Sequence, residues 1–219
     1  MRDITTEVFE AVLFDNDGTL VDSSAVVVRT WRAWADHYDV PYERFVGFHG
    51  VPSRGIVQMV APHLDVDDAT AHIDRLELED QEGIVVLPGA IEAIAALDGR
   101  AAVVTSAGAE LAARRLAAAG VTPPAVVVSA DDIPRGKGKP DPEPYLAGAR
   151  QLGVDPAKCL VVEDAPAGLK AGRAAGAATL AVTTTSSRDE LEPLADLVVE
   201  DLAQVRFEVT DEGVRVHRA

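Results

Sequence analysis

The stretch Ala11–Ser23, AVLFDNDGTLVDS, runs from apolar residues directly into acidic ones. The apolar run before Asp15 is typical of a buried strand, because it is short and ends at polar residues. Asp15 and Asp17 have a spacing that, on a strand, puts both side chains on one face, roughly 6 to 7 Å apart. Two carboxylates so placed repel each other unless a cation lies between them. The stretch therefore predicts a strand that ends at a cation-binding site.

Composition limits the classes of protein that the chain can represent. Its 219 residues, 47% of them hydrophobic, suit one large domain or a core with a smaller inserted domain. A formal net charge of -16 disfavours nucleic acid and anionic membranes as partners. We expect a cytoplasmic protein, because neither a signal-peptide pattern nor a run near the ~20 apolar residues of a membrane span occurs. The single cysteine, Cys159, excludes an intrachain disulfide and is typical of a buried apolar position.

Short runs rich in valine and alanine recur along the chain, at EAVLF, AAVVTS, PAVVVSA, CLVVED and ATLAVTT. Segments with helical periodicity separate them, at GAIEAIAAL, AELAARRLAAAG, PEPYLAGARQLG and PAGLKAGRAAG. This alternation predicts an α/β fold with a doubly wound, Rossmann-like parallel sheet. The C-terminal segment AQVRFEVTDEGVRVHRA alternates on both sides of DEG and predicts a β-hairpin.

The region from about Val21 to Val86 shows no convincing buried strand. It holds amphipathic, helix-like segments, among them SSAVVVRTWRAWADHYD and DVDDATAHIDRLELEDQEG. We therefore expect a helical domain at residues 21–87, inserted into a discontinuous core formed by residues 1–20 and 88–219. Trp31 and Trp34 are expected in the core of the inserted domain rather than at a binding surface.

Ligands of open α/β sheets bind outside the carboxyl ends of the strands. The polar residues that close the apolar runs, with one lysine from the loop RGKGKPDPEPY, are Asp15, Asp17, Ser106, Lys139, Glu163 and Asp164. Together they fit phosphoryl transfer, where catalysis consists mainly of positioning and charge neutralisation. Oxygen-only ligands favour Mg²⁺ as the cation.

Each of these residues also has an ordinary structural interpretation when taken alone. DNDG is common in turns and in calcium loops, although the glutamate of a calcium loop is missing at the required spacing. Ser106 alone would be a strand-end hydroxyl, Lys139 a surface lysine, and Asp164 a helix N-cap before APAGLKAG. Their joint occurrence at strand ends favours the functional interpretation.

Four segments, FDNDGTL, VVTSAG, GKPDPEPY and VVEDAPAGLKAG, resemble in this order the motifs of the haloacid dehalogenase superfamily, and they span nearly the whole chain. The resemblance implies that Asp15 is a nucleophile that forms an aspartyl phosphate. It implies that Asp17 first protonates the leaving group and then activates water. Ser106 and Lys139 would hold the phosphoryl oxygens.

The same resemblance implies the remaining ligands of the site. Mg²⁺ would be bound by Asp15, by the backbone carbonyl of Asp17 and by Asp164, with Glu163 near or in its coordination shell. The additional substrate-binding positions implied are Gly18, Thr19 and Ala107.

The insertion after the first motif resembles the helical cap of the subgroup that contains sugar phosphate phosphatases, phosphoglycolate phosphatases and β-phosphoglucomutase. Such a cap closes over the core, selects the substrate and excludes water. Within the cap segment FHGVPSRGI, the resemblance indicates Arg54 as the first substrate contact and His49 as a second. Alone, Arg54 could be a solvated helix residue and His49 a structural histidine.

One position separates hydrolysis from phosphate migration. β-Phosphoglucomutase has a histidine in the cap hinge where this chain has Val27, which cannot donate that hydrogen bond. The sequence therefore predicts a Mg²⁺-dependent phosphatase for a small sugar or polyol phosphate, acting as a monomer or weak dimer. The alternatives are a phosphoglycolate phosphatase, a β-phosphoglucomutase-like mutase and a non-catalytic sensor of a phosphate ligand.

Overall fold

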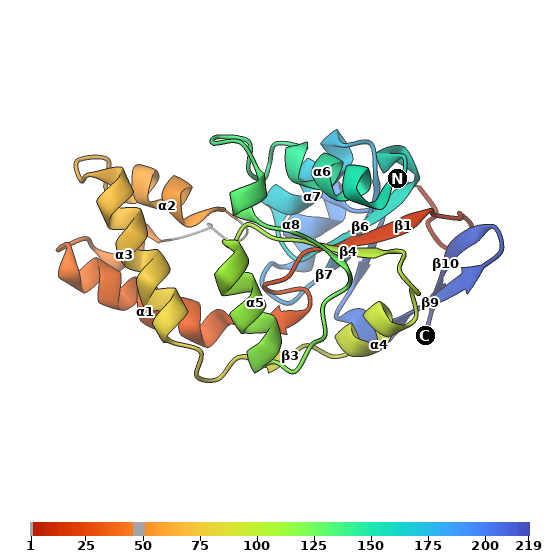
Figure 1. Ribbon diagram of the computed structural model, residues 1–219, viewed down its shortest axis with the longest axis horizontal. Coiled ribbons are helices and arrows are strands. Elements are labelled where there is room, and N and C mark those ends of the chain that lie inside the picture. The colour runs from red at the N-terminus through yellow and green to blue at the C-terminus, as the bar shows by residue number, and fades with distance from the viewer. Residues whose placement is uncertain (1, 46–50) are drawn as a thin grey trace.

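A six-stranded parallel sheet with the order β5-β4-β1-β6-β7-β8 forms the centre of the computed structural model, which describes residues 2–45 and 51–219 (Figure 1). In that spatial order the strands are Val126–Val128, Ala101–Val104, Ala11–Phe14, Cys159–Glu163, Ala178–Val182 and Leu197–Val199. The predicted doubly wound α/β core is confirmed. The edge strand β8 is an addition, because only five apolar runs were assigned to the sheet.

Both faces of the sheet are covered, which explains why its strands are apolar without alternation. On β1, Val12 and Phe14 belong to the core on one face, whereas Leu13 belongs to the core on the other. The first face packs against α4 (Ala90–Ala95), α5 (Ala109–Ala118) and the C-terminal hairpin. The second packs against α6 (Glu143–Leu152) and α7 (Pro166–Ala174), while the short α8 (Arg188–Leu191) lies beyond α7. Cys159 is buried, as predicted.

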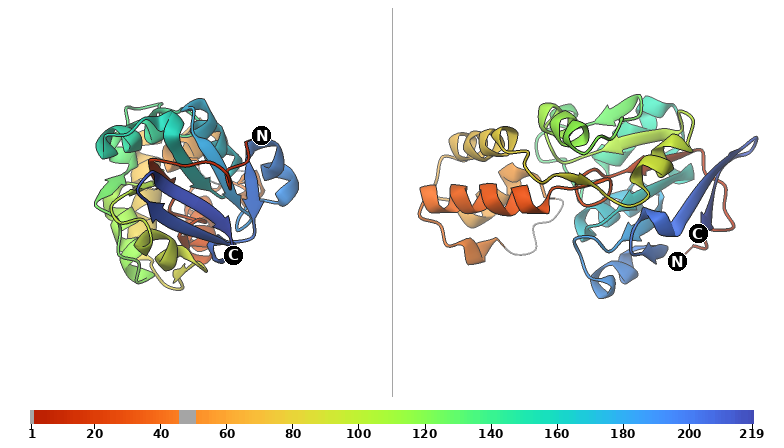
Figure 2. Two further views of the ribbon diagram at one scale, coloured as in Figure 1. Left: turned by 90° about the vertical axis from the view of Figure 1, so that its right-hand side faces the viewer. Right: turned by 90° about the horizontal axis from the view of Figure 1, so that it is seen from below.

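The C-terminal segment forms the predicted antiparallel hairpin of β9 (Val205–Thr210) and β10 (Gly213–Arg218). Phe207 meets Phe14 of the central strand edge-on, with the ring centroids 5.8 Å apart. Figure 2 shows the hairpin at the end of the molecule remote from the inserted helices. None of the helices in the described ranges is long and apolar enough to cross a membrane.

The inserted helices are α1 (Ser24–His37), α2 (Ser53–Val60) and α3 (Val66–Glu79), and they share a hydrophobic core of their own. Trp34 lies in this core, as predicted, and its indole N–H donates to the Ala69 carbonyl at 2.8 Å. This bond ties α1 to α3. Trp31 belongs to the same core but also lines the cavity described below, so the expectation that it lies away from a binding surface was wrong. Figure 1 shows the three helices together at one end of the molecule.

Two short strands connect the inserted helices to the sheet. β2 (Val21–Asp22) and β3 (Val85–Val86) pair antiparallel where the chain leaves the core and returns to it. This pair is an addition to the prediction, which concerned buried strands, since both residues of β3 are exposed. Strands of this length are too short to show the alternation that marks longer ones.

Candidate active site

The chain turns sharply directly after β1. The carbonyl of Asn16 accepts backbone N–H groups from residues 19–21, so Asp17 lies in a tight loop rather than on the strand. The expectation that Asp15 and Asp17 share one strand face was therefore wrong. Gly18 has φ +86°, a conformation that favours glycine, and a Cβ there would overlap the carboxylate of Asp164. Glycine thus lets the loop after β1 approach the end of β6.

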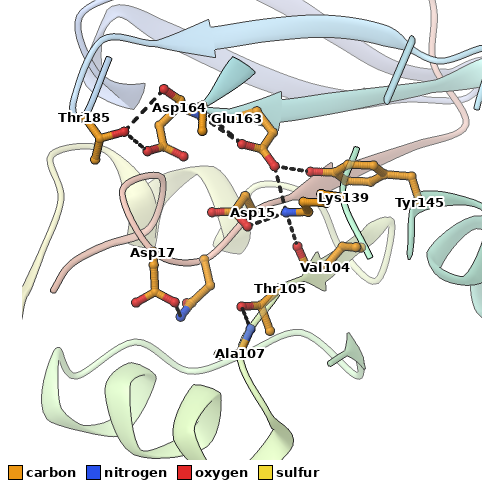
Figure 3. Close-up of polar contacts among 12 residues, drawn as sticks. Asp15, Asp17, Val104, Thr105, Ala107, Lys139, Tyr145, Glu163, Asp164 and Thr185 are labelled. Carbon is orange, nitrogen blue, oxygen red and sulfur yellow. Dashed lines mark hydrogen bonds and ion pairs between the residues drawn. The ribbon is translucent and has the colours of Figure 1, made fainter. Parts of the chain in front are cut away.

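A buried lysine organises the polar groups at this edge of the sheet. Nζ of Lys139 donates to Asp15, to Oε1 of Glu163 at 2.7 Å and to the Val104 carbonyl at 2.9 Å (Figure 3). The hydroxyl of Tyr145 donates to the same Oε1 of Glu163 at 2.7 Å. Lys139 is therefore not a surface residue, because its three donors are used within the site.

Asp15, Glu163 and Asp164 form an acidic cluster whose carboxylate oxygens lie within 4.8 Å of one another. Burial raises the pKa of Asp15 to about 7 against the opposing charge of Lys139, and burial raises the pKa of Asp164 well above its usual range. For Lys139, burial acts to lower the pKa, but Asp15 and Glu163 together raise it above its ordinary value. One lysine faces three carboxyl groups, so an oxygen-binding divalent cation fits this cluster both in charge and in ligand type.

The first turn of α7 shapes the other side of the cluster. A Cβ at Gly168 would overlap the Glu163 carboxylate, whose Oε2 accepts the backbone N–H groups of Asp164 and Ala165 at 3.2 and 3.3 Å. The N-cap of α7 is Ala165, so the interpretation of Asp164 as a helix N-cap was wrong. The Asp164 carboxylate instead accepts a hydrogen bond from the hydroxyl of Thr185, a residue of the loop after β7 (Figure 3).

The carboxylate of Asp17 is held apart from the cluster. Its Oδ1 accepts the Ser23 hydroxyl at 2.7 Å and lies 2.9 Å from Nη1 of Arg115, a buried residue of α5. Arg115 also faces Glu77 of α3, where burial raises the carboxyl pKa to about 7 against the charge of the guanidinium. Arg115, Glu77 and Tyr145 were not predicted from the sequence as residues of the site. The signal for Arg115 is its helical spacing from Leu111, on the apolar face of α5.

The loop after β4 supplies hydroxyl groups to the same region. Ser106 and Ala107 line the cavity described below, and the Ala107 N–H donates to the hydroxyl of Thr105 at 3.1 Å.

The loop after β1 also contributes to this region. Gly18 lines the cavity, and its carbonyl accepts a hydrogen bond from the hydroxyl of Thr184. Thr19 is buried, and its hydroxyl has no hydrogen-bond partner within the described residues.

A cavity of about 510 Å³ lies between the sheet edge and the inserted helices. From the core it is lined by Asp15, Asp17, Thr105, Ser106, Arg115, Asp164 and Thr185, and from the helices by Val27, Trp31, Ser53, Arg54, Thr70, Asp74 and Glu77, among others. Arg54 lines this cavity but also forms an ion pair with Asp67 of α3. His49 lies outside the described residues.

These contacts bring Asp15, Lys139, Glu163 and Asp164 into one cluster, with Asp17 and Ser106 on the wall of the same cavity. A parallel sheet with a lysine-bound acidic cluster at its carboxyl edge is typical of α/β enzymes, which bind their ligands outside the carboxyl ends of the strands.

Comparison with known proteins identifies the family within that class. Residues 9–176 match the family model of haloacid dehalogenase-like hydrolases. The chain is 38% identical over 200 residues to hexitol phosphatase A of Escherichia coli (strain K12), covering 88% of this chain and 91% of that protein. The chain therefore belongs to the haloacid dehalogenase-like hydrolase family.

A second relative and a solved structure agree with this assignment. The chain is 33% identical over 212 residues to validoxylamine A 7'-phosphate phosphatase of Streptomyces hygroscopicus subsp. limoneus, covering 91% of this chain and 97% of that protein. The crystal structure of a hydrolase from Pseudomonas syringae matches with a TM-score of 0.79 at 27% identity, covering 89% of this chain and 94% of that one.

Proposed function

We propose that the protein is a Mg²⁺-dependent phosphatase that hydrolyses a small sugar or polyol phosphate monoester. The observation that carries the proposal is the Asp15 carboxylate, which lines the cavity while Lys139 holds it beside two further carboxyl groups. Relatives named as phosphatases support the reaction class.

In the first step, an Asp15 oxygen attacks the phosphorus and the ester P–O bond breaks, with Asp17 giving its proton to the departing alkoxide. In the second step, Asp17 takes a proton from water, which attacks the aspartyl phosphate and releases inorganic phosphate. Ser106 holds a phosphoryl oxygen, and the charge of Lys139 stabilises the phosphoryl group in both steps.

The acidic cluster fits Mg²⁺, which when bound would neutralise charge on the transferred phosphoryl group. Asp15, Asp164 and the backbone carbonyl of Asp17 would hold the ion, with Glu163 beside it.

Residues 21–87 act in this proposal as a cap domain that selects the substrate. The cap contributes Asp74 and Glu77 to the cavity, and these acidic groups favour a neutral hydroxyl-bearing substrate over the carboxylate of phosphoglycolate. Val27, the residue at the mutase histidine position, lines the cavity and offers no hydrogen bond, which favours hydrolysis over phosphate migration.

Phosphate release from a panel of phosphorylated metabolites tests the proposal. We expect release from at least one small sugar or polyol phosphate in the presence of Mg²⁺, and loss of release when a chelator is added. Hydrolysis that persists in excess chelator would contradict the metal assignment. Binding of a phosphate ester without turnover would favour the sensor alternative.

Arg54 provides a test of substrate selection by the cap. If Arg54 contacts the part of the substrate remote from phosphorus, Arg54→Ala should lower kcat/KM for the preferred ester by about 10- to 100-fold, the range of a hydrogen bond to a charged group. The loss on an aryl phosphate should be much smaller. Arg75→Ala, at an exposed arginine of α3, is the matched control. Equal losses on both esters would return Arg54 to a solvated, structural role.

A further inference from the structure

Arg115 joins the core to the inserted helices at a single buried guanidinium. It lies on α5, is 4% exposed, and places Nη1 2.9 Å from Oδ1 of Asp17 and Nη2 3.3 Å from Oε1 of Glu77. Asp17 belongs to the loop after β1, whereas Glu77 lies near the end of α3. Figure 1 shows α5 at the boundary between the sheet and the inserted helices.

Packing alone does not account for an arginine at this position. The neighbouring buried residues of α5 are apolar, and the Nε atom of Arg115 has no hydrogen-bond partner in the described part of the chain. Nη2 forms an ion pair with Oε1 of Glu77 at 3.3 Å. A buried charge with an unpaired donor is costly, and an apolar residue of similar volume would often fit such a site at no loss of stability. The position of Arg115 beside a carboxylate of the active-site cavity points to a role in the reaction.

The contacts of Asp17 indicate what that role is. Oδ1 is held by two donors, Arg115 and the hydroxyl of Ser23, while Oδ2 receives the amide of Asn16 at 3.2 Å. Holding one oxygen fixes the plane of the carboxyl group and leaves Oδ2 as the oxygen that can carry the transferred proton. A guanidinium does not exchange protons at working pH, so Arg115 cannot replace Asp17.

We infer that Arg115 is a positioning residue that orients Asp17 for proton transfer and, through Glu77, couples this orientation to the docking of α3 on the core. The inference rests on the proposed function. When α3 is docked, the Nη2 atom of Arg115 pairs with Glu77 and the Nη1 atom pairs with Asp17. When α3 moves away, Arg115 loses its second partner and the orientation of Asp17 is less restricted.

The test compares two esters that differ in their need for an acid. A polyol phosphate has a poor alkoxide leaving group that requires the proton of Asp17, whereas an aryl phosphate has a good leaving group that does not. The comparison uses kcat/KM, which reports the steps up to formation of the aspartyl phosphate and excludes the later attack of water, in which Asp17 acts on both esters alike. Arg115→Met should lower kcat/KM for the polyol ester by about 10²-fold, the cost of misplacing a catalytic group by about 1 Å. It should lower kcat/KM for the aryl ester by less than about 10-fold. Asp17→Asn should show the same dependence on the ester with a larger loss, about 10²- to 10⁴-fold.

Combining the substitutions isolates the route by which Arg115 acts. In the Asp17→Asn background, Arg115→Met should cause little further loss, because no acid remains to be oriented. Arg115→Lys keeps the charge but not the forked geometry, and should give the same dependence on the ester with a smaller loss. If Arg115→Met fails to fold, Arg115→Lys can test the inference in its place.

Arg114 is the matched control. It is the next residue of α5, donates to the Leu78 carbonyl of α3 at 3.1 Å, and pairs with Glu110. Arg114→Met thus removes a contact between α5 and α3 without touching Asp17, and its loss of kcat/KM on the polyol ester should be much smaller than that of Arg115→Met.

Two results would overturn the inference while leaving the phosphatase intact. One is an equal loss on both esters in Arg115→Met, and the other is a full further loss when it is combined with Asp17→Asn. A third measurement needs no turnover: the Tm losses of Glu77→Gln and Arg115→Met should not be additive, and additive losses would refute the coupling to α3. Failure of the wild-type protein to release phosphate would contradict the proposed function instead, and the Tm cycle would still decide the coupling.

Discussion

Asp15→Asn is expected to abolish phosphate release, with a fall in kcat on the order of 10⁶-fold, the scale seen when a catalytic nucleophile is removed. An amide is not a nucleophile toward phosphorus, and no aspartyl phosphate can then form at this position. The fold should persist, because asparagine has nearly the same shape and Lys139 keeps its bond to Glu163. Phosphate release and the Tm of the variant check both expectations.

Two controls make this result interpretable. Asp141→Asn changes a carboxylate in the loop that carries Lys139, where it pairs with the exposed Lys137, and should retain activity. Mass spectrometry of the Asp15 variant should exclude deamidation and contaminating wild type, and in quenched wild-type reactions it should find phosphate on the peptide that contains Asp15. Substantial activity in a verified variant would refute the nucleophile role.

The sheet was predictable because its strands are buried on both faces. Covering helices on each side make almost every position of β1, β4, β6 and β7 apolar, with Thr179 and Glu163 as the exceptions, and such runs can be recognised in the sequence. β8 was not predicted because its short apolar stretch, Leu197–Val199, lies between the acidic Asp196 and Glu200. It is an edge strand, and its place in the sheet depends on pairing with β7.

The site was predictable where function depends on residues at strand ends, and not where it depends on packing between elements. Asp15 could be placed from the end of its strand, and Lys139, which lies in a loop, could be placed beside it from the family resemblance. The contact of Asp17 with Arg115 depends on how α5 packs beside the loop after β1, which no local pattern encodes. The pairing of Arg54 with Asp67 likewise depends on the packing of α2 against α3.

The second large effect concerns Lys139, which is buried between Asp15 and Glu163. Lys139→Met keeps an unbranched side chain, shorter by the terminal amine, but leaves two buried carboxyl groups without their cation. We expect the free energy of unfolding to fall by about 3–5 kcal/mol, the cost of breaking a buried ion pair on one side. We also expect kcat to fall by about 10²- to 10³-fold, as for loss of a group that stabilises developing charge. Urea unfolding in the presence of a chelator measures the first effect without a divalent cation that could replace the lysine charge.

Lys137→Met in the same loop separates this effect from the general loss of a lysine. Lys137 is largely exposed and forms only a surface pair with Asp141 at 3.1 Å, so its removal should change the free energy of unfolding by less than about 0.5 kcal/mol. If Lys139→Met also cost less than about 1 kcal/mol, the carboxyl groups it faces would have to be protonated or hydrated in the folded protein. Protonated groups would lack the negative charge that makes the cluster suitable for a divalent cation. The stability of this one variant therefore tests the electrostatic basis of the proposed metal site independently of any activity measurement.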